Sequence, residues 1–268
     1  MWQTTPKKEG EEPQVIELPK KAEISKKEVK QLNQIFTPLS EVAARRKLKI
    51  GIYGDTETGK SHFCLTCPEP IYFIDTEFGV APLRKKFANK KIYVLECFVE
   101  NPETLKVDPI RSLDMMDEAI DSLKDVNEGT IAIDSGTDIW DWLEEYMKSR
   151  VSAQMRELQQ FDWGIANKRY KEMMMRLLSR DTVFVITAQP KELYIGAQRS
   201  GIYAPSWQKK TPFWVDVILH LQKFPPATHL QKTRYMATIT KCRAERMYDK
   251  QIEDISYDKL YEAVKPYL

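Results

Sequence analysis

Residues 54–61 of the chain contain the spacing Gly-x-x-x-x-Gly-Lys-Ser, with every fixed position filled. A loop of this type between a strand and a helix directs main-chain N–H groups toward a phosphate, the lysine reaches the β- and γ-phosphates, and the serine hydroxyl binds Mg²⁺. Ser61 is therefore a predicted metal ligand. The predicted ATP-binding residues are Gly54, Asp55, Thr56, Glu57, Thr58, Gly59, Lys60, Ser61 and His62.

Two acidic residues follow apolar runs elsewhere in the chain. The run "TIAIDS" reaches Asp134, and an aspartate in this position holds the water shell of the magnesium ion beside Ser61. Capping of the following helix is compatible with that role. Glu77 in "YFIDTEFGV" follows the strand after the phosphate-loop helix, where a carboxylate can orient the attacking water. The alternative for Glu77 is a solvated acid at a strand end.

Alternating strand and helix patterns are predicted to position these residues. Continuous apolar runs indicate strands buried on both faces of a parallel sheet, whereas the last two runs alternate and indicate an antiparallel hairpin. The predicted strands are 49–53, 70–75, 91–96, 130–135, 182–188, 215–221 and 234–242, and the helical patterns are 60–66, 80–88, 111–126 and 136–180. This order predicts an α/β P-loop NTPase domain over 47–268, with a mostly parallel central sheet flanked by helices, after a polar N-terminal arm over 1–46.

The motifs and their order resemble those of the RecA/RadA recombinase family. The matching stretches are "IDTE", "AIDSGTDIW", "VFVITAQ" and the terminal hairpin, over about residues 47–246. The stretch "FDWGIANKRYKEMMMRLL" before "ITAQ" resembles compact single-domain RecA-like proteins of phages and archaea, some of which are single-strand-annealing ATPases. The resemblance implies a RecA-like core in which Glu77 polarises water and Gln189 senses the γ-phosphate. It also implies a homo-oligomer with ATP at the subunit interface.

Residues 190–212 are predicted to form a long loop in which cations alternate with aromatic rings. Its candidate DNA-binding residues are Lys191, Tyr194, Arg199, Tyr203, Trp207, Lys209 and Lys210. Cations that follow the phosphates and rings that stack on bases suit single-stranded DNA, and the resemblance implies a DNA-binding loop in this place. Lys209 and Lys210 have two other interpretations. They would reach the γ-phosphate of a neighbouring subunit, or they would be ordinary lysines of a solvated lid.

The formal charge is only +2, but it is unevenly distributed along the chain. Residues 75–150 hold 17 acidic and 10 basic side chains, whereas residues 186–250 hold 4 acidic and 11 basic ones and are suited to a polyanion. No apolar run approaches a membrane span of about 20 residues, and the first residues lack the apolar core of a secretory signal. We therefore expect a cytoplasmic protein without a membrane partner.

The four cysteines do not suggest a disulfide framework or a zinc site. His62, Cys64 and Cys67 lie close together in "HFCLTC", but a structural zinc site needs four ligands. We predict that Cys64 and Cys67 pack in the core instead.

The expected function is that of a magnesium-dependent ATPase acting on single-stranded DNA in recombination, annealing or repair. One alternative is a non-catalytic nucleotide-gated regulator resembling RadB or KaiC-like proteins. The other is a small-molecule kinase, which would need a lid carrying several arginines, whereas residues 190–212 contain only Arg199.

Overall fold

The computed structural model describes residue 36 and residues 47–154, 157–226, 232–243, 245, 247 and 249–267. The chain divides into two units, residues 1–44 and 45–268, and all described residues except Phe36 belong to the second unit. The predicted N-terminal arm over 1–46 therefore lies outside the described residues apart from Phe36.

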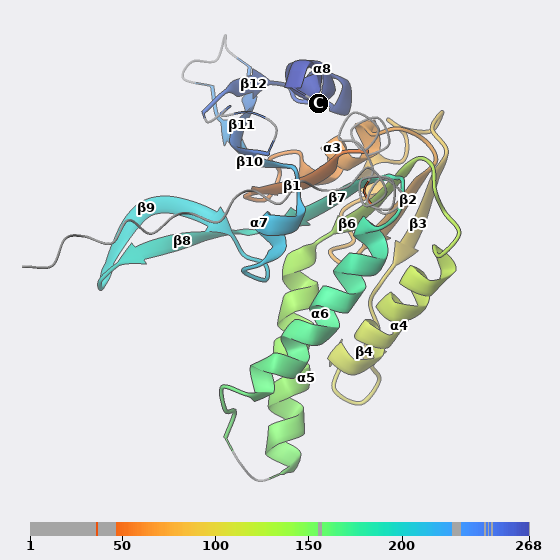
Figure 1. The fold of residues 1–268 in the computed structure, drawn as a ribbon, viewed down its shortest axis with the longest axis vertical. Coiled ribbons are helices and arrows are strands. Elements are labelled where there is room, and N and C mark those ends of the chain that lie inside the picture. Colours follow the sequence, from red (N-terminus) through yellow and green to blue (C-terminus); the bar gives the residue numbers. More distant parts are fainter. Residues whose placement is uncertain are drawn as a thin grey trace, which may run out of the picture. The chain divides into compact units, whose positions relative to one another are not determined.

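An eight-stranded sheet forms the centre of the second unit (Figure 1). The strand order is β12-β11-β10-β1-β7-β6-β2-β3, in which the six strands from β10 to β3 are parallel and β11 and β12 are antiparallel. The strands are β1 (Lys49–Gly54), β2 (Ile71–Asp75), β3 (Ile92–Glu96), β6 (Thr130–Asp134), β7 (Val183–Ala188), β10 (Val217–Phe224), β11 (Arg234–Cys242) and β12 (Gln251–Glu253). The predicted RecA-like architecture, with a mostly parallel sheet and a C-terminal antiparallel hairpin, is confirmed.

Helices cover both faces of this sheet, because successive residues of its buried strands point to opposite sides. Ile131 and Ile133 of β6 face one core, and Ala132 between them faces the other. The first core includes residues of α4 (Pro109–Ser122), α5 (Gly136–Ala153) and α6 (Asp162–Leu178); the second includes residues of α3 (Lys60–Thr66) and α8 (Tyr257–Val264). The short elements are η1 (Ala81–Leu83), α7 (Thr211–Trp214) and η2 (Lys265–Tyr267). Among the described helices, none is long and apolar enough to cross a bilayer.

Three predicted helical segments have different limits in the structure. The pattern over 136–180 is divided into α5 and α6, and the carboxylate of Asp162 accepts a 2.8 Å hydrogen bond from the main-chain N–H of Gln159 at the turn between them. The pattern over 80–88 forms only the short η1, followed by turns. The pattern over 111–126 forms α4, which begins two residues earlier, at Pro109, because Asp108 caps it through the N–H groups of residues 110 and 111.

The predicted loop over 190–212 is wrong for most of its length. Residues 190–205 form an antiparallel hairpin of β8 (Pro190–Ile195) and β9 (Gln198–Pro205), which extends away from the central sheet in Figure 1. Its two-residue connection begins with Gly196 at φ +64°, a conformation that glycine adopts without strain. A second small ribbon pairs β4 (Glu100–Asn101) with β5 (Lys106–Val107).

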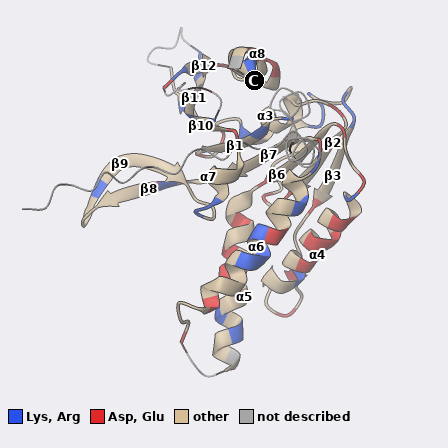
Figure 2. Cartoon of the chain, viewed as in Figure 1, with Lys and Arg blue, Asp and Glu red and all other residues tan. Residues whose placement is uncertain are grey.

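The uneven charge of the sequence is visible on the elements (Figure 2). Acidic residues gather along α4 and α5, whereas Lys and Arg residues lie along the β8–β9 hairpin and near its base. Part of the acidic excess is paired within the fold, because Arg169 of α6 forms ion pairs of 3.0 Å with Asp114 and 2.8 Å with Asp117 of α4.

Candidate active site

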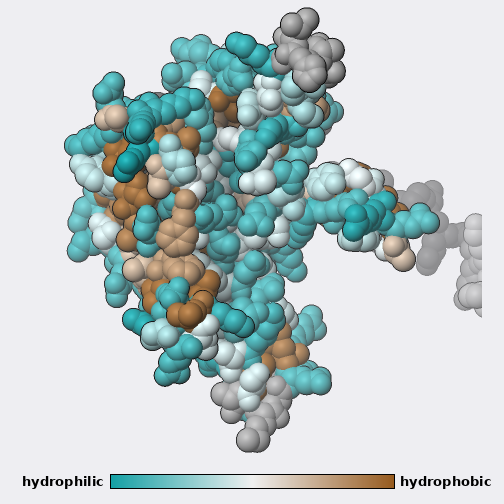
Figure 3. Space-filling view, turned by 180° about the vertical axis from the view of Figure 1, so that it is seen from behind, coloured by the Kyte–Doolittle hydropathy of each residue, from teal (hydrophilic) through white to brown (hydrophobic). Residues whose placement is uncertain are grey.

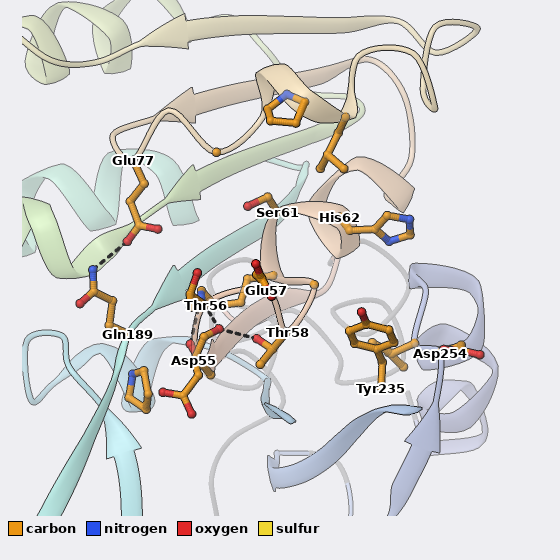
Figure 4. Close-up of a pocket in the computed structure, with 18 of the residues that line it drawn as sticks. Asp55, Thr56, Glu57, Thr58, Ser61, His62, Glu77, Gln189, Tyr235 and Asp254 are labelled. Atoms are coloured by element: carbon orange, nitrogen blue, oxygen red, sulfur yellow. Dashed lines mark hydrogen bonds between the residues drawn. The ribbon is translucent and has the colours of Figure 1, made fainter. Parts of the chain in front are cut away.

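A cavity of about 1000 Å³ opens at the carboxyl ends of β1, β2 and β7 (Figure 4). Open α/β sheets bind their ligands at this edge. Residues 54–62 line the cavity together with Glu77, Gly79 and Gln189. The fold therefore brings together the predicted nucleotide-binding residues and the three predicted catalytic residues, Lys60, Glu77 and Gln189. The other lining residues are Pro82, Leu83, Lys86, Pro190, Tyr235, Asp254 and Ile255.

The phosphate loop, residues 54–61, has the backbone that its glycines predict. A Cβ atom at Gly54 would lie 2.3 Å from the carbonyl oxygen of Leu221, and Gly59 caps α3 with φ +97°. The Lys60 side chain is only 8% exposed, and its Nζ donates hydrogen bonds to the carbonyl oxygens of Gly54 at 2.9 Å and Asp55 at 3.0 Å. The ammonium group is therefore held directly over the loop.

Ser61 and Asp134, the predicted metal ligands, are in contact. Ser61 Oγ donates a 2.5 Å hydrogen bond to Asp134 Oδ2, and Thr187 Oγ1 donates to Oδ1 of the same carboxylate. Asp134 is fully buried, which raises the pKa of its carboxyl group, while the two hydroxyl donors act in the opposite direction. This pair of hard oxygen ligands fits Mg²⁺. The described residues contain no cluster of three His, Cys, Asp or Glu side chains, and Mg²⁺ at P-loop sites needs none because phosphates and water complete its shell.

Glu77 and Gln189 come from the ends of β2 and β7, with β6 between those strands in the sheet. Gln189 Nε2 donates a 3.0 Å hydrogen bond to Glu77 Oε1, which Figure 4 shows at one side of the cavity. Asp75 has a role that the sequence pattern alone does not indicate. Its buried carboxylate accepts hydrogen bonds from the main-chain N–H groups of Glu77 at 3.2 Å, Gly79 at 3.1 Å and Val80 at 3.0 Å. Asp75 thus holds the turn that presents Glu77.

A second contact joins this turn to the end of β6. Thr76 Oγ1 donates a 2.5 Å hydrogen bond to Asp138 Oδ2 and accepts a 2.7 Å hydrogen bond from the main-chain N–H of Ser135. Burial is the main cause that raises the pKa of the Asp138 carboxyl group, and the Thr76 hydroxyl opposes it. The residue before Glu77 is therefore fixed to the first turn of α5.

Thr137 ties the cavity to the base of the β8–β9 hairpin. Its hydroxyl donates a 2.7 Å hydrogen bond to the carbonyl oxygen of Ser206 and accepts a 3.0 Å hydrogen bond from the main-chain N–H of Gln189. Ser206 N–H in turn donates to the carbonyl oxygen of Gln189 at 2.8 Å. The residues on either side of the hairpin are thus held together at Thr137, and one of them lines the cavity.

The hairpin gathers three DNA-binding candidates on one face. Opposed residues in an antiparallel pair share a face, and so do residues two apart on one strand. The register pairs Glu192 with Tyr203 and Tyr194 with Arg199, and it shifts between these two pairs. The pairs still lie together, because Glu192 and Tyr194 are two apart on β8 and Glu192 Oε2 forms a 3.6 Å ion pair with Arg199 Nε. Tyr194 is 60% exposed and Tyr203 is 45% exposed. The exposed Lys191 is directed to the opposite face by the same alternation.

The prediction that Trp207 stacks on bases is wrong. The residue is only 4% exposed, and its ring packs so closely on β1 that a Cβ atom at Gly51 would lie 2.6 Å from the ring atom Cη2. Lys209 and Lys210 are exposed. The neighbouring Phe213 was missed, although it is 74% exposed. The available signal was its position, because Phe213 is an aromatic residue close to Lys209 and Lys210 that lies outside the predicted strands.

The cysteines beside the phosphate loop belong to the core, as predicted. Cys64 and Cys67 are each 0% exposed, and burial raises the pKa of both thiols. His62 makes an edge contact with Phe87, with ring centroids 5.1 Å apart, and burial lowers the pKa of its imidazole.

A family model described as an AAA domain matches residues 46–244, a range that contains the phosphate loop, Glu77, Asp134 and Gln189. The chain belongs to this AAA-domain family. It is therefore a P-loop ATPase by family, and membership of this family implies a nucleotide as the ligand of the phosphate loop.

Solved structures similar to this AAA-domain chain include one described as a prototypical ATPase from the type III secretion system of pathogenic bacteria. The sequences are 11% identical and the TM-score is 0.40. The match covers 66% of this chain and 52% of that chain, so it spans about half of the similar ATPase. A comparison with proteins of curated function finds no match.

Proposed function

We propose that this AAA-domain protein is a magnesium-dependent ATPase that acts on single-stranded DNA in recombination, annealing or repair. In kind it is similar to the compact single-domain RecA-like proteins of phages and archaea. The observation that carries the proposal is the 3.0 Å hydrogen bond between Gln189 and Glu77 beside the phosphate loop. This hydrogen bond joins a carboxylate that can orient water to Gln189, the residue that directly precedes strand β8 of the exposed hairpin.

In the proposed reaction, the side chains around the phosphate loop position the triphosphate and its nucleophile. Lys60 exchanges the carbonyl oxygens of Gly54 and Asp55 for oxygens of the β- and γ-phosphates. Ser61 and Asp134 would hold Mg²⁺, which neutralises charge on the phosphate oxygens when it is bound. Glu77 accepts a hydrogen bond from the attacking water and aims it at the γ-phosphorus, opposite the bond to the leaving ADP.

Gln189 links the nucleotide state to the hairpin in this account. When ATP binds, the Gln189 side chain gives up the hydrogen bond to Glu77 and donates one to the γ-phosphate. Its main chain is hydrogen-bonded to Thr137 and Ser206 at the base of β8 and β9. A movement of Gln189 therefore changes the position of the hairpin base relative to the central sheet. This is a route by which DNA on the hairpin would alter the position of Glu77.

The exposed residues of the hairpin support single-stranded DNA as the partner. Tyr194 and Tyr203 present rings on the same face as Arg199, and base stacking on an aromatic side chain contributes about 1–3 kcal/mol per base. Lys209 and Lys210 precede the exposed ring of Phe213 and extend the same type of surface toward α7.

A homo-oligomer with ATP at the subunit interface is part of the proposal. Strand β3 is last in the strand order, so its outer edge has no strand partner within the described part of the sheet. Tyr93 and Val94 on this edge are 50% and 46% exposed, and Figure 3 shows an apolar patch on this side of the unit. Exposed apolar surface at an unpaired edge is a feature of protein interfaces.

The proposal is tested by the rate of phosphate release as a single-stranded oligonucleotide is added at two salt concentrations. We expect stimulation that weakens at higher salt, because cation contacts to phosphates release counterions. The Tyr194→Ala/Tyr203→Ala variant should lose stimulation but keep the basal rate, whereas Tyr261→Ala, a similarly exposed tyrosine on α8, should behave as the wild type.

Other outcomes would favour the alternatives. ATP binding without turnover, with or without DNA, would indicate a nucleotide-gated regulator. Transfer of the γ-phosphate to a small metabolite would indicate a kinase.

A further inference from the structure

The cavity continues beyond the groups that a triphosphate needs. Glu77 and Gln189 lie at one side of the phosphate loop, and Tyr235 lies at the other side in Figure 4. If the γ-phosphate faces Glu77, the α-phosphate and the nucleoside must extend toward the opposite side. The nucleoside is thereby directed toward Tyr235.

Apart from the charged Lys86 and Asp254, the lining residues outside the phosphate-binding groups are mostly apolar or aromatic. Pro82, Leu83 and Ile255 are apolar, and Tyr235 adds an aromatic ring that is 36% exposed. Apolar side chains and an accessible ring suit a flat heteroaromatic base rather than a phosphate. The ring of His62 is less available, because its edge contact with Phe87 already uses one side.

The fold holds Tyr235 in place from several directions. It pairs with Lys223 in the β10–β11 register, and Lys223 Nζ forms a 2.5 Å ion pair with Glu57 of the phosphate loop. On the other side, the main-chain N–H of Asp254 donates a 2.9 Å hydrogen bond to the carbonyl oxygen of Tyr235. The main chain at Tyr235 is therefore fixed relative to the phosphate loop before a ligand arrives.

The turn at Asp254 is itself braced. Asp254 has a φ of +48°, and Lys259 Nζ of α8 donates 2.9 Å hydrogen bonds to the carbonyl oxygens of Glu253 and Asp254. Asp254 and Ile255 lie beyond residues 46–244, the range that the AAA-domain model matches. This wall of the cavity is thus supplied by Tyr235 of β11 and by the turn between β12 and α8.

From these contacts we infer that Tyr235 is the stacking platform for the nucleobase, with Ile255 and Leu83 as apolar walls, and that the site selects purine nucleoside triphosphates. A purine presents two fused rings to the tyrosine, whereas a pyrimidine presents one and buries less area. This inference rests on the proposed function, because it assumes that the phosphate loop binds a nucleoside triphosphate.

The test compares affinities for three probes, measured calorimetrically with Mg²⁺ on the full chain: the β,γ-imido analogue of ATP, cytidine triphosphate and inorganic tripolyphosphate. Tyr235→Ala should weaken binding of the ATP analogue about 10-fold, the size expected for one lost stacking contact. It should leave tripolyphosphate binding unchanged and reduce the preference for the ATP analogue over cytidine triphosphate.

Two control variants separate stacking from structure. Tyr235→Phe keeps the ring and should bind the ATP analogue as the wild type does. Tyr261→Ala removes a tyrosine of nearly equal exposure, 37%, outside the cavity and should change none of the affinities.

Several results would overturn the inference. An equal loss for tripolyphosphate and the ATP analogue in Tyr235→Ala would mean that the ring only supports the phosphate loop. Unchanged affinity of Tyr235→Ala for the ATP analogue would mean that the nucleobase binds elsewhere, although the phosphate loop still binds the triphosphate. If the wild-type chain bound none of the three probes, the proposed function would fail together with the inference.

Discussion

At the scale of single residues, the proposed chemistry depends on the carboxylate of Glu77, which the fold positions at the cavity and leaves exposed. Glu77 is exposed to the cavity, whereas Asp75, two residues before it, is buried and holds the turn through three main-chain N–H groups. The two acids therefore have separate tasks. Asp75 shapes the loop, and Glu77, which accepts a hydrogen bond from Gln189, is exposed to water in the cavity.

Glu77→Gln should retain nucleotide binding and lose turnover. The amide keeps the size of the side chain but cannot act as a base, and removal of a general base lowers a rate by about 10²–10⁴-fold. Phosphate release measures turnover, and calorimetry with an ATP analogue measures binding. Glu96→Gln is the matched control, because Glu96 ends the adjacent strand β3 and lies outside the cavity.

The contrasting variant is Lys60→Ala, which should abolish tight nucleotide binding rather than turnover alone. Normal ATP hydrolysis by Glu77→Gln would show that another group activates the water.

Sequence reasoning at this scale located the phosphate loop, Asp134 and Glu77, because motif spacing and strand ends are local features. It did not reveal the task of Asp75, since a carboxylate that accepts three main-chain N–H groups is recognised only once the turn is folded. It also misjudged Trp207. The burial of that ring depends on the absence of a side chain at Gly51, more than 150 positions away.

At the scale of elements, Thr137 connects the cavity to the hairpin through the hydrogen bonds of its hydroxyl, and we call this contact the Thr137 clasp. The Thr137 hydroxyl is shared by the main chains of Gln189 and Ser206, and Thr137 is 5% exposed. Its position in the first turn of α5 places this connection next to Asp134 at the end of β6.

Thr137→Val should uncouple DNA from hydrolysis. The substitution keeps the shape of the side chain but leaves a main-chain N–H and a carbonyl oxygen without a partner, which costs about 1–3 kcal/mol of folding stability. We expect the hairpin base to loosen, so that single-stranded DNA no longer stimulates phosphate release. Thr137→Ser keeps the hydroxyl and should retain stimulation. Equal stimulation in the Val and Ser variants would remove the clasp from the account.

The elements themselves were predicted unevenly from the sequence. Continuous apolar runs such as 182–188 indicated buried strands correctly. The run at 91–96 was predicted in the same way, but it forms the edge strand β3, in which Tyr93 and Val94 are 50% and 46% exposed. The sequence predicts a loop where the β8–β9 hairpin forms, since the two strands bury few side chains and their glycine and proline residues are typical of loops. The alternation of "KELYI" and the glycine at 196 were the available signals.

At the scale of the whole molecule, the spatial order of strands creates the site. Strand β7 lies between β1 and β6, so segments far apart in the chain, at residues 54–61, 77 and 189, meet around one cavity. Hydrophobic patterns do not give this order. The resemblance to RecA-like proteins implied only which strand ends would carry the proposed water-activating and sensing residues.

Subunit mixing tests whether the exposed Lys210 acts on the ATP of a neighbour. Lys60→Ala subunits would lack ATP, and Lys210→Ala subunits would lack the cation, so each preparation alone should hydrolyse ATP poorly. If the lysine acts in trans, mixed oligomers should recover part of the activity, because a Lys60→Ala subunit can still supply Lys210. No recovery, together with weaker DNA binding by Lys210→Ala, would assign this lysine to DNA.

The central claim is that one cavity holds a triphosphate on the loop 54–61 with Glu77 facing its terminal phosphate. A crystal structure with Mg²⁺ and a non-hydrolysable ATP analogue measures this most directly. We predict Lys60 on the β- and γ-phosphates, Ser61 on the metal, and the Glu77 carboxylate within one water molecule of the γ-phosphorus. An empty cavity, or a Glu77 side chain turned away from bound nucleotide, would contradict the account.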